Sequence, residues 1–232
     1  MKTTRLINLW MFVLIAFLAN VPMHAQFLGA SETGPLHSLS VLKPPPGNDV
    51  AIVVFEDLGC PACAHAHPIE LKVAAAEHVP ILRYDFPIQG HIWTAQGAID
   101  ARYIQNHISP KLADQYRTDV FAAQMSIANK DDIQRFTQLW LQRHGQQMPF
   151  VLDPTQSLAQ AVQSDYDRGR SINVTYTPTI IVVTKDKQQV ICGTGDNSYD
   201  NPDHILPAVE AAIAQCRKTA TPIHNIVNTH RD

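Results

Sequence analysis

The apolar positions between residues 50 and 86 follow a pattern that predicts a strand, a helix and a second strand. Residues 50–55 form a continuous β-prone run, which is typical of a strand buried on both faces of a sheet. We expect a helix over residues 61–77, because proline at position 61 suits a first turn that needs no amide hydrogen. The second strand is expected over residues 79–86. Together they predict a βαβ unit with parallel strands.

The segment that follows, residues 91–171, contains helical patterns only. Its apolar residues recur at spacings of three and four, which predicts a series of amphipathic helices. Strand signal returns at residues 179–183 and 188–192, and we expect these two strands to form a hairpin. A last amphipathic helix is expected over residues 202–216.

The order of these elements predicts an α/β fold. Without the helical block, a mixed four-stranded sheet flanked by helices remains, so the block is expected to be an insertion into the sheet domain. A short strand is also expected over residues 36–42. The predicted organisation is a lead and first sheet part at 26–90, an all-helical insertion at 91–171, a second sheet part at 172–217 and a flexible polar tail at 218–232.

The first residues have the order of a secretory signal peptide, predicted over residues 1–25. Lys2 and Arg5 precede an apolar stretch at residues 9–19, and the small residue Ala25 follows. Met23 stands where a small residue is preferred, so an uncleaved membrane anchor remains an alternative. If the signal peptide is cleaved, we expect a soluble protein in the periplasm or another extracytoplasmic compartment, where disulfides persist.

Composition narrows the class of function only slightly. The chain has 232 residues, of which 45% are hydrophobic and 17% charged, as in a soluble protein with a real core. The formal net charge is −3, and no basic stretch indicates nucleic-acid binding.

Cys60-Pro61-Ala62-Cys63 is the sequence feature that points to chemistry. Cys60 is predicted where a buried strand ends and a helix begins, and there the helix amides favour a negative charge. A thiolate is the form that attacks disulfides, and Cys63 is spaced to resolve a mixed disulfide formed at Cys60. In an exported chain, this arrangement predicts a redox-active pair.

Two other interpretations of the cysteine pair are open. Cys60, Cys63 and either His65 or His67 could bind a metal ion, but no second cysteine pair completes a four-ligand set. A purely structural disulfide would close so short a loop that it would stabilise the fold little. We expect neither a metal nor an organic cofactor.

Several segments resemble the DsbA-like branch of the thioredoxin superfamily. They are residues 52–57 before the cysteine motif, Asp85-Phe86-Pro87 with His91, and Thr177-Pro178-Thr179 before a strong strand. The resemblance implies a monomeric thioredoxin fold, a central mixed sheet flanked by helices, with an inserted helical subdomain. It also implies an exposed nucleophile at Cys60, a buried resolving thiol at Cys63 and a substrate-docking cis-proline loop at Thr177-Pro178.

The resemblance further implies a protein disulfide oxidoreductase that introduces disulfides into unfolded or folding exported polypeptides with free cysteines. A quinone-linked membrane partner would reoxidise it. The alternatives are an extracytoplasmic reductase or isomerase and, in a different class, a Cys/His metal-binding module or a redox-inactive chaperone.

The chain departs from this family pattern at two places. Many relatives carry a buried acid six residues before the first cysteine, where this chain has Val54; Glu56 or Asp57 could serve as the proton relay instead, or both could be ordinary loop charges. The dipeptide between the cysteines is Pro-Ala and not Pro-His. The missing histidine leaves the redox potential open.

Cys192 and Cys216 are two further cysteines with no part in this motif. They could form a structural disulfide in an exported protein, or both could be buried core residues, since each falls on an apolar face. The spacing alone does not decide between these alternatives.

Overall fold

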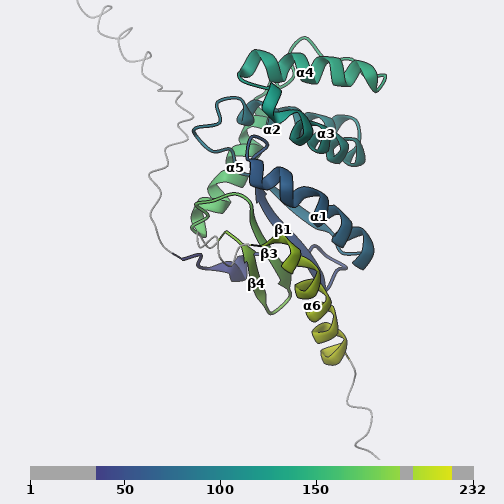
Figure 1. Ribbon diagram of the computed structural model, residues 1–232, viewed down its shortest axis with the longest axis vertical. Coiled ribbons are helices and arrows are strands. Elements are labelled where there is room, and N and C mark those ends of the chain that lie inside the picture. The colour runs from purple at the N-terminus through teal and green to yellow at the C-terminus, as the bar shows by residue number, and fades with distance from the viewer. Residues whose placement is uncertain (1–34, 194–200, 221–232) are drawn as a thin grey trace, which may run out of the picture. The chain divides into compact units, whose positions relative to one another are not determined.

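The fold is built on one mixed sheet of four strands in a computed structural model that describes residues 35–193 and 201–220 (Figure 1). The strand order is β2-β1-β3-β4. Strand β1 pairs in parallel with β2, and β3 is antiparallel to both β1 and β4. The strands are β1 (Val50–Glu56), β2 (Ile81–Asp85), β3 (Thr179–Thr184) and β4 (Gln188–Cys192). The predicted mixed sheet, its parallel βαβ unit and its hairpin are confirmed.

Strand β1 occupies the interior of the sheet, and all seven of its residues are buried. Its apolar side chains alternate between the two faces, so each face of the sheet needs a covering helix. Helix α1 (Pro61–Glu77) follows β1 and has the bounds that the sequence predicts. It starts at Pro61 directly after Cys60, as the first-turn preference of proline favours.

Helices cover both faces of the sheet. Ile52 and Val54 pack with residues of α1 and of α6 (Ile205–Ala220) in one apolar cluster. On the other face, Phe55 and Phe86 meet α5 (Ser157–Ser171) so closely that a Cβ atom at Gly169 would lie 2.7 Å from the Phe86 ring. The result is a three-layer arrangement of helices on both sides of one sheet.

The remaining helices form the predicted insertion between β2 and β3. They are α2 (Thr94–His107), α3 (Pro110–Ala123), the short 3₁₀ helix η2 (Gln124–Ser126) and α4 (Lys130–Arg143), with α5 returning to the sheet. Figure 1 shows α2, α3 and α4 gathered beyond the end of β1 from which α1 begins. The insertion has its own apolar cluster, and that cluster includes Leu58, Cys60 and Cys63. The cysteine pair therefore lies between the sheet domain and the insertion.

The prediction of a strand over residues 36–42 is wrong. The structure has a short 3₁₀ helix, η1 (Leu39–Val41), preceded by Ser38 with a φ of 53°. This left-handed backbone breaks the extended conformation that a strand needs. The last predicted helix also begins differently, with a 3₁₀ turn at η3 (Pro202–His204) before α6.

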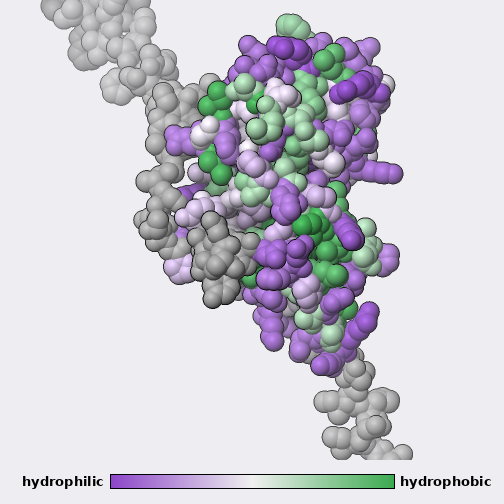
Figure 2. Space-filling view, viewed as in Figure 1, coloured by the Kyte–Doolittle hydropathy of each residue, from purple (hydrophilic) through white to green (hydrophobic). Residues whose placement is uncertain are grey.

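The face drawn in Figure 2 carries hydrophilic residues over most of its area, with hydrophobic residues gathered in smaller areas between them. Within the described part of the chain, no helix has the length and apolar character that a membrane span requires. The predicted signal peptide at residues 1–25 and most of the predicted tail lie outside the described residues.

Candidate active site

Cys60 lies at the point where the polypeptide leaves β1 and enters α1. It is the N-cap residue of α1, with extended backbone angles, and only 7% of it is exposed. The Cys63 side chain hydrogen-bonds to its sulfur and is the main reason that the pKa of Cys60 falls to about 6. Burial opposes this shift, while the Thr177 side chain and the backbone amides of Cys63 and Ala62 add to it. The site therefore stabilises a thiolate at Cys60.

Cys63 is affected in the opposite direction. It is buried in the first turn of α1, and this burial raises the pKa of its thiol well above the ordinary value. The hydrogen bond to Cys60 and the negative charge of that sulfur raise it further. The pair thus consists of one sulfur that releases its proton readily, Cys60, and one that keeps it, Cys63. Thiol–disulfide exchange depends on such a difference between the attacking and leaving thiols.

The Thr177–Pro178 peptide bond is cis and lies against the cysteine pair. The Cys60 sulfur lies 3.2 Å from the carbonyl oxygen of Thr177, to which the thiol donates. The hydroxyl group of Thr177 is buried and has no hydrogen-bond partner among the described residues, and the Thr177 side chain lowers the pKa of Cys60. Residues that the sequence places far apart are therefore brought together at one site.

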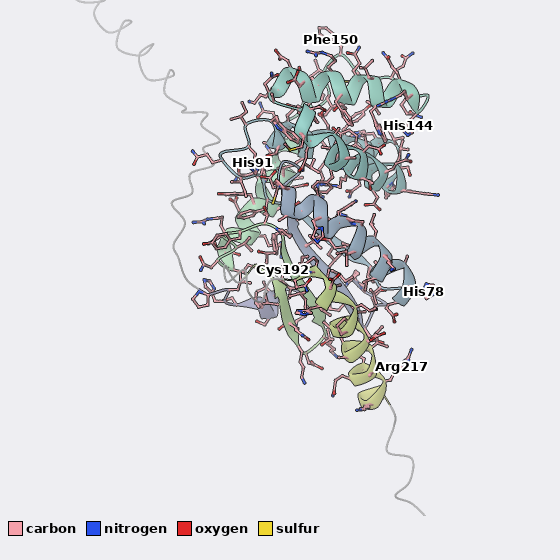
Figure 3. All side chains as sticks on the ribbon, viewed as in Figure 1. His78, His91, His144, Phe150, Cys192 and Arg217 are labelled. Carbon is pink, nitrogen blue, oxygen red and sulfur yellow. The ribbon has the colours of Figure 1, made fainter. Side chains whose placement is uncertain are left out.

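Asp57 and Glu56 are both buried, which removes the alternative that they are ordinary loop charges. The Asp57 carboxylate accepts from the amides of Gly59 (2.8 Å) and Ile88 (2.7 Å), and its Oδ2 lies 2.8 Å from Nδ1 of His91. Burial raises the pKa of Asp57, and these hydrogen bonds oppose the shift. Figure 3 labels His91, whose side chain is about one-third exposed, at 34%. The Asp57–His91 contact thus connects a buried acid beside the turn to the surface.

Glu56 belongs to a network of buried ion pairs behind the cysteines. Its two oxygens accept from Arg83 and Arg117, both at 2.9 Å. Arg83 also contacts Glu70 (3.1 Å), and Arg117 contacts Asp85 (2.8 Å). The negative charge of Glu56 contributes to the raised pKa of Cys63. Because arginine donors already occupy both oxygens, Glu56 is less suited than Asp57 to relay a proton.

One group of side chains in the described part of the chain could hold a metal ion, and it excludes the cysteines. The ligating atoms of Glu56, His67 and Glu70 lie within 4.8 Å of one another. The two carboxylates are already paired with arginines, so the negative charge that a cation would need is largely neutralised. His65 is exposed, and Nε2 of His67 contacts the hydroxyl of Thr118 at 2.9 Å. The geometry gives no support to a site made of the cysteines and a histidine.

Gln124 is a residue of the site that sequence reasoning missed. Its side-chain amide reaches from η2 to the carbonyl groups of Leu58 and Cys60, at 3.1 and 3.4 Å. No local signal could have identified it, because its place depends on how α3 packs beside α1.

Cys192 and Cys216 lie in one apolar cluster but at different levels of the sheet. Cys192 is paired through Ile180 to Val54 of β1, whereas the Cys216 sulfur lies 3.8 Å from the carbonyl oxygen of Asp49. Five residues of strand separate these levels, or about 16 Å. In Figure 3, Cys192 and Arg217, the neighbour of Cys216, are correspondingly far apart. A bridge between them would require α6 to move along the sheet.

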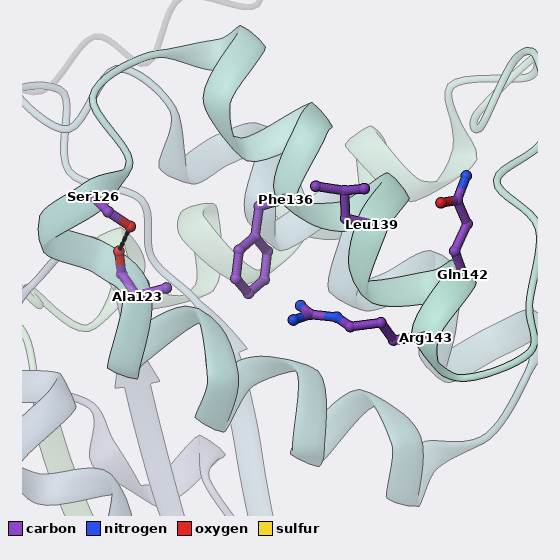
Figure 4. Close-up of a pocket in the computed structure, with 6 residues that line it drawn as sticks. All are labelled: Ala123, Ser126, Phe136, Leu139, Gln142 and Arg143. Carbon is purple, nitrogen blue, oxygen red and sulfur yellow. Dashed lines mark hydrogen bonds between the residues drawn. The ribbon is translucent and has the colours of Figure 1, made fainter.

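The open hollow drawn in Figure 4 lies in the insertion. Its lining comes from α3, η2 and α4, with Phe136, Leu139 and Arg143 projecting from α4. It contains neither cysteine, and its lining carries no group suited to thiol chemistry.

Comparisons with known proteins agree with the fold. Residues 46–190 match the family model described as Thioredoxin. Solved structures with a similar fold include α-DsbA1 of Wolbachia pipientis (13% identity, TM-score 0.60), covering 79% of this chain and 99% of that chain. They also include DsbA2 of Pseudomonas aeruginosa (15%, 0.50), with coverage of 78% and 95%. ScsC of Proteus mirabilis (15%, 0.56) is a third, with coverage of 74% and 71%. No curated protein matches the chain.

Proposed function

The chain belongs to the thioredoxin family of disulfide oxidoreductases and carries that fold with a DsbA-like helical insertion. From this premise we propose that it is an exported dithiol oxidase. Its substrates are unfolded or folding polypeptides with free cysteines outside the cytoplasm. The predicted signal peptide at residues 1–25 would direct the export, and the protein would act as a monomer.

The observation that carries this proposal is the opposite effect of the site on its two thiols. Cys60 is stabilised as a thiolate, with a pKa of about 6, while the pKa of Cys63 is raised well above its ordinary value. A stable thiolate favours the dithiol form of the enzyme over its disulfide form. The disulfide is then readily reduced by substrate thiols, which is the property of an oxidase.

The reaction follows from these positions. A substrate thiolate attacks the sulfur of Cys60 in the Cys60–Cys63 disulfide, and a mixed disulfide forms while Cys63 leaves and takes up a proton. A second substrate thiolate then attacks the substrate sulfur of the mixed disulfide and releases Cys60 as a thiolate. Two electrons pass from the substrate to the enzyme, and the substrate gains one disulfide.

Asp57 is the better of the two predicted proton relays. Its carboxyl group is buried beside the turn, its pKa is raised, and it contacts the half-buried His91. A proton required at Cys63 would pass along this route. Thr177 and Pro178 would dock an extended substrate through main-chain hydrogen bonds.

The partner that restores the disulfide is a proposal of the same kind. A quinone-linked membrane protein would accept two electrons from Cys60 and Cys63, and no metal or organic cofactor would be bound by this chain. The partner would exchange electrons with Cys60, which is the N-cap residue of α1.

The reduction potential of the Cys60–Cys63 pair tests the oxidase proposal. The protein is equilibrated with mixtures of reduced and oxidised glutathione, and the fraction of dithiol is measured after acid quenching. A potential near about −120 mV supports an oxidase, whereas a value near about −270 mV would assign the protein to the reductases. The Cys60→Ser variant, which lacks the nucleophile, serves as the control and should not oxidise a reduced substrate peptide. A wild-type protein that fails to oxidise this peptide would contradict the proposal.

A further inference from the structure

The carbonyl groups of the active-site turn are bound by a side chain of the helical insertion. Nε2 of Gln124 lies 3.1 Å from the carbonyl oxygen of Leu58 and 3.4 Å from that of Cys60. Gln124 is the first residue of η2, directly after α3, and only 9% of it is exposed. The Gln124 amide group therefore connects the insertion to the carbonyl groups of Leu58 and Cys60, in the turn that leads into α1.

This turn needs a donor from outside itself. Leu58 lies between the end of β1 and the start of α1, so neither the sheet nor the helix supplies a partner for its carbonyl group. Leu58 and Cys60 are both buried, which keeps water from filling that role. A buried carbonyl group without a donor is costly, and the Gln124 amide meets this need.

The amide groups of the same turn are held from the other side. The Gly59 amide donates to the Asp57 carboxylate at 2.8 Å, and the Cys60 amide donates to the Asp57 carbonyl oxygen at 3.0 Å. The turn is thus fixed through its N–H groups by Asp57 and at its Leu58 carbonyl by Gln124, while the Cys60 carbonyl also accepts from the Ala64 amide of α1 at 3.1 Å. The amides that follow this turn, those of Ala62 and Cys63, hydrogen-bond to the Cys60 sulfur and lower its pKa.

We propose that Gln124 is a positioning residue through which the helical insertion sets the oxidising strength of the Cys60–Cys63 disulfide. This inference rests on the proposed function, because it concerns the same pair of thiols. Without the Gln124 amide, the turn can rotate, and the helix amides no longer face the sulfur squarely. The thiolate then loses stabilisation, the dithiol form loses stability relative to the disulfide, and the disulfide becomes a weaker oxidant.

Two substitutions remove the amide. Gln124→Leu replaces it with an apolar group, and Gln124→Met keeps the length of the side chain if the branched leucine does not fit. For both variants we expect the equilibrium constant for reduction of the protein disulfide by glutathione to fall about tenfold, which corresponds to about 30 mV. The thiolate absorbance of Cys60 should titrate at a higher pH than in the wild type.

Thr137→Val is the matched control for a change that only loosens the insertion. Thr137 is buried in α4 and is hydrogen-bonded to Asp100 and Tyr116, away from the turn. This variant should melt at a lower temperature than the wild type while its glutathione equilibrium stays unchanged. If the equilibrium constant with glutathione shifts equally in the Thr137 and Gln124 variants, the proposal is overturned, because the stability of the insertion would then be the cause.

The remaining outcomes also separate the two proposals. If the wild type exchanges with glutathione but folded Gln124→Met has the same equilibrium constant, the positioning role of Gln124 is wrong and the oxidoreductase function stands. If neither Gln124 variant folds, the amide is a structural tie, and the proposal is likewise overturned. A wild type that does not exchange with glutathione at all contradicts the proposed function itself.

Discussion

The sulfur of Cys60 lies 3.2 Å from the carbonyl oxygen of Thr177, a residue 117 positions further along the chain. The protonated thiol can donate to this oxygen, but the thiolate cannot. The thiolate can instead accept from the hydroxyl group of Thr177, which is buried and lowers the pKa of Cys60. The same residue therefore offers one group to each protonation state of the sulfur.

Removing the Thr177 hydroxyl should make the thiolate less stable. In Thr177→Val we expect the pKa of Cys60 to rise from about 6 by about one unit, because one hydrogen bond to the charged form is lost. The ultraviolet absorbance of the thiolate, followed against pH, measures this shift. Thr175→Val, in the same loop, is the control and should titrate as the wild type. An unchanged titration in Thr177→Val would contradict a role for the hydroxyl.

The largest contribution to the low pKa of Cys60 comes from the side chain of Cys63, and this predicts a difference between two substitutions. Cys63→Ala removes the hydrogen-bond donor, so the Cys60 thiolate should form only at a pH well above about 6. Cys63→Ser keeps a donor at the same position and should retain most of the shift. The rate of alkylation by iodoacetamide as a function of pH distinguishes the two variants. Identical profiles would mean that the hydrogen bond is not the cause.

Sequence reasoning located Cys60 and Cys63 because their signals are local. The end of an apolar strand, a first-turn proline and a three-residue spacing all fall within a few positions. Pro178 lacks such a local signal, because a proline before a strand is common, and its role is implied only by the family resemblance. Sequence reasoning could not place Gln124, whose contact with the turn exists only once α3 has packed beside α1. Periodicity shows which face of a helix is buried, but it does not show which distant backbone group that face will meet.

The buried acids show a second limit of the sequence. At the end of a strand, Glu56 has the appearance of a loop charge, because nothing nearby in the chain can pair with it. Its partners, Arg83 and Arg117, come from β2 and α3. A carboxylate is buried only where such partners converge, so its burial follows from the assembled fold and not from its neighbours in sequence.

The low pKa of Cys60 should make the stability of the dithiol form depend on pH. The pKa falls from an ordinary value of 9.0 to about 6 in the folded protein. Folding therefore favours the ionised form, and this contribution is absent below pH 6, grows between pH 6 and 9, and is complete above pH 9. We compare the melting temperatures of the reduced wild type and of reduced Cys60→Ala. The wild-type value minus the variant value should increase from pH 5 to pH 8. A difference that stays constant over this range would show that the thiolate is not stabilised by the fold.

Arg117 is the residue whose loss should most affect the stability of the network behind the cysteines. It is 2% exposed, and its Nη1 contacts Glu56 at 2.9 Å and Asp85 at 2.8 Å. Arg117→Met would leave these two buried acids with fewer partners, and we expect it to lower the free energy of unfolding by about 3–5 kcal/mol. Urea unfolding at neutral pH measures this loss.

The surface pair Arg135–Asp132, with a separation of 3.6 Å and an arginine that is 67% exposed, supplies the control. Arg135→Met should change the free energy of unfolding by less than about 1 kcal/mol, because solvent screens an exposed pair. The effect of Arg117→Met should also depend on pH. Arg117 opposes the effect of burial and helps to hold the pKa of Asp85 below its ordinary value of 3.8, so its contribution is complete above that pH and shrinks as the pH falls further. Equal losses for the two arginines, or a loss for Arg117→Met that grows in acid, would show that the buried pairs do not stabilise the fold in the way the contacts indicate.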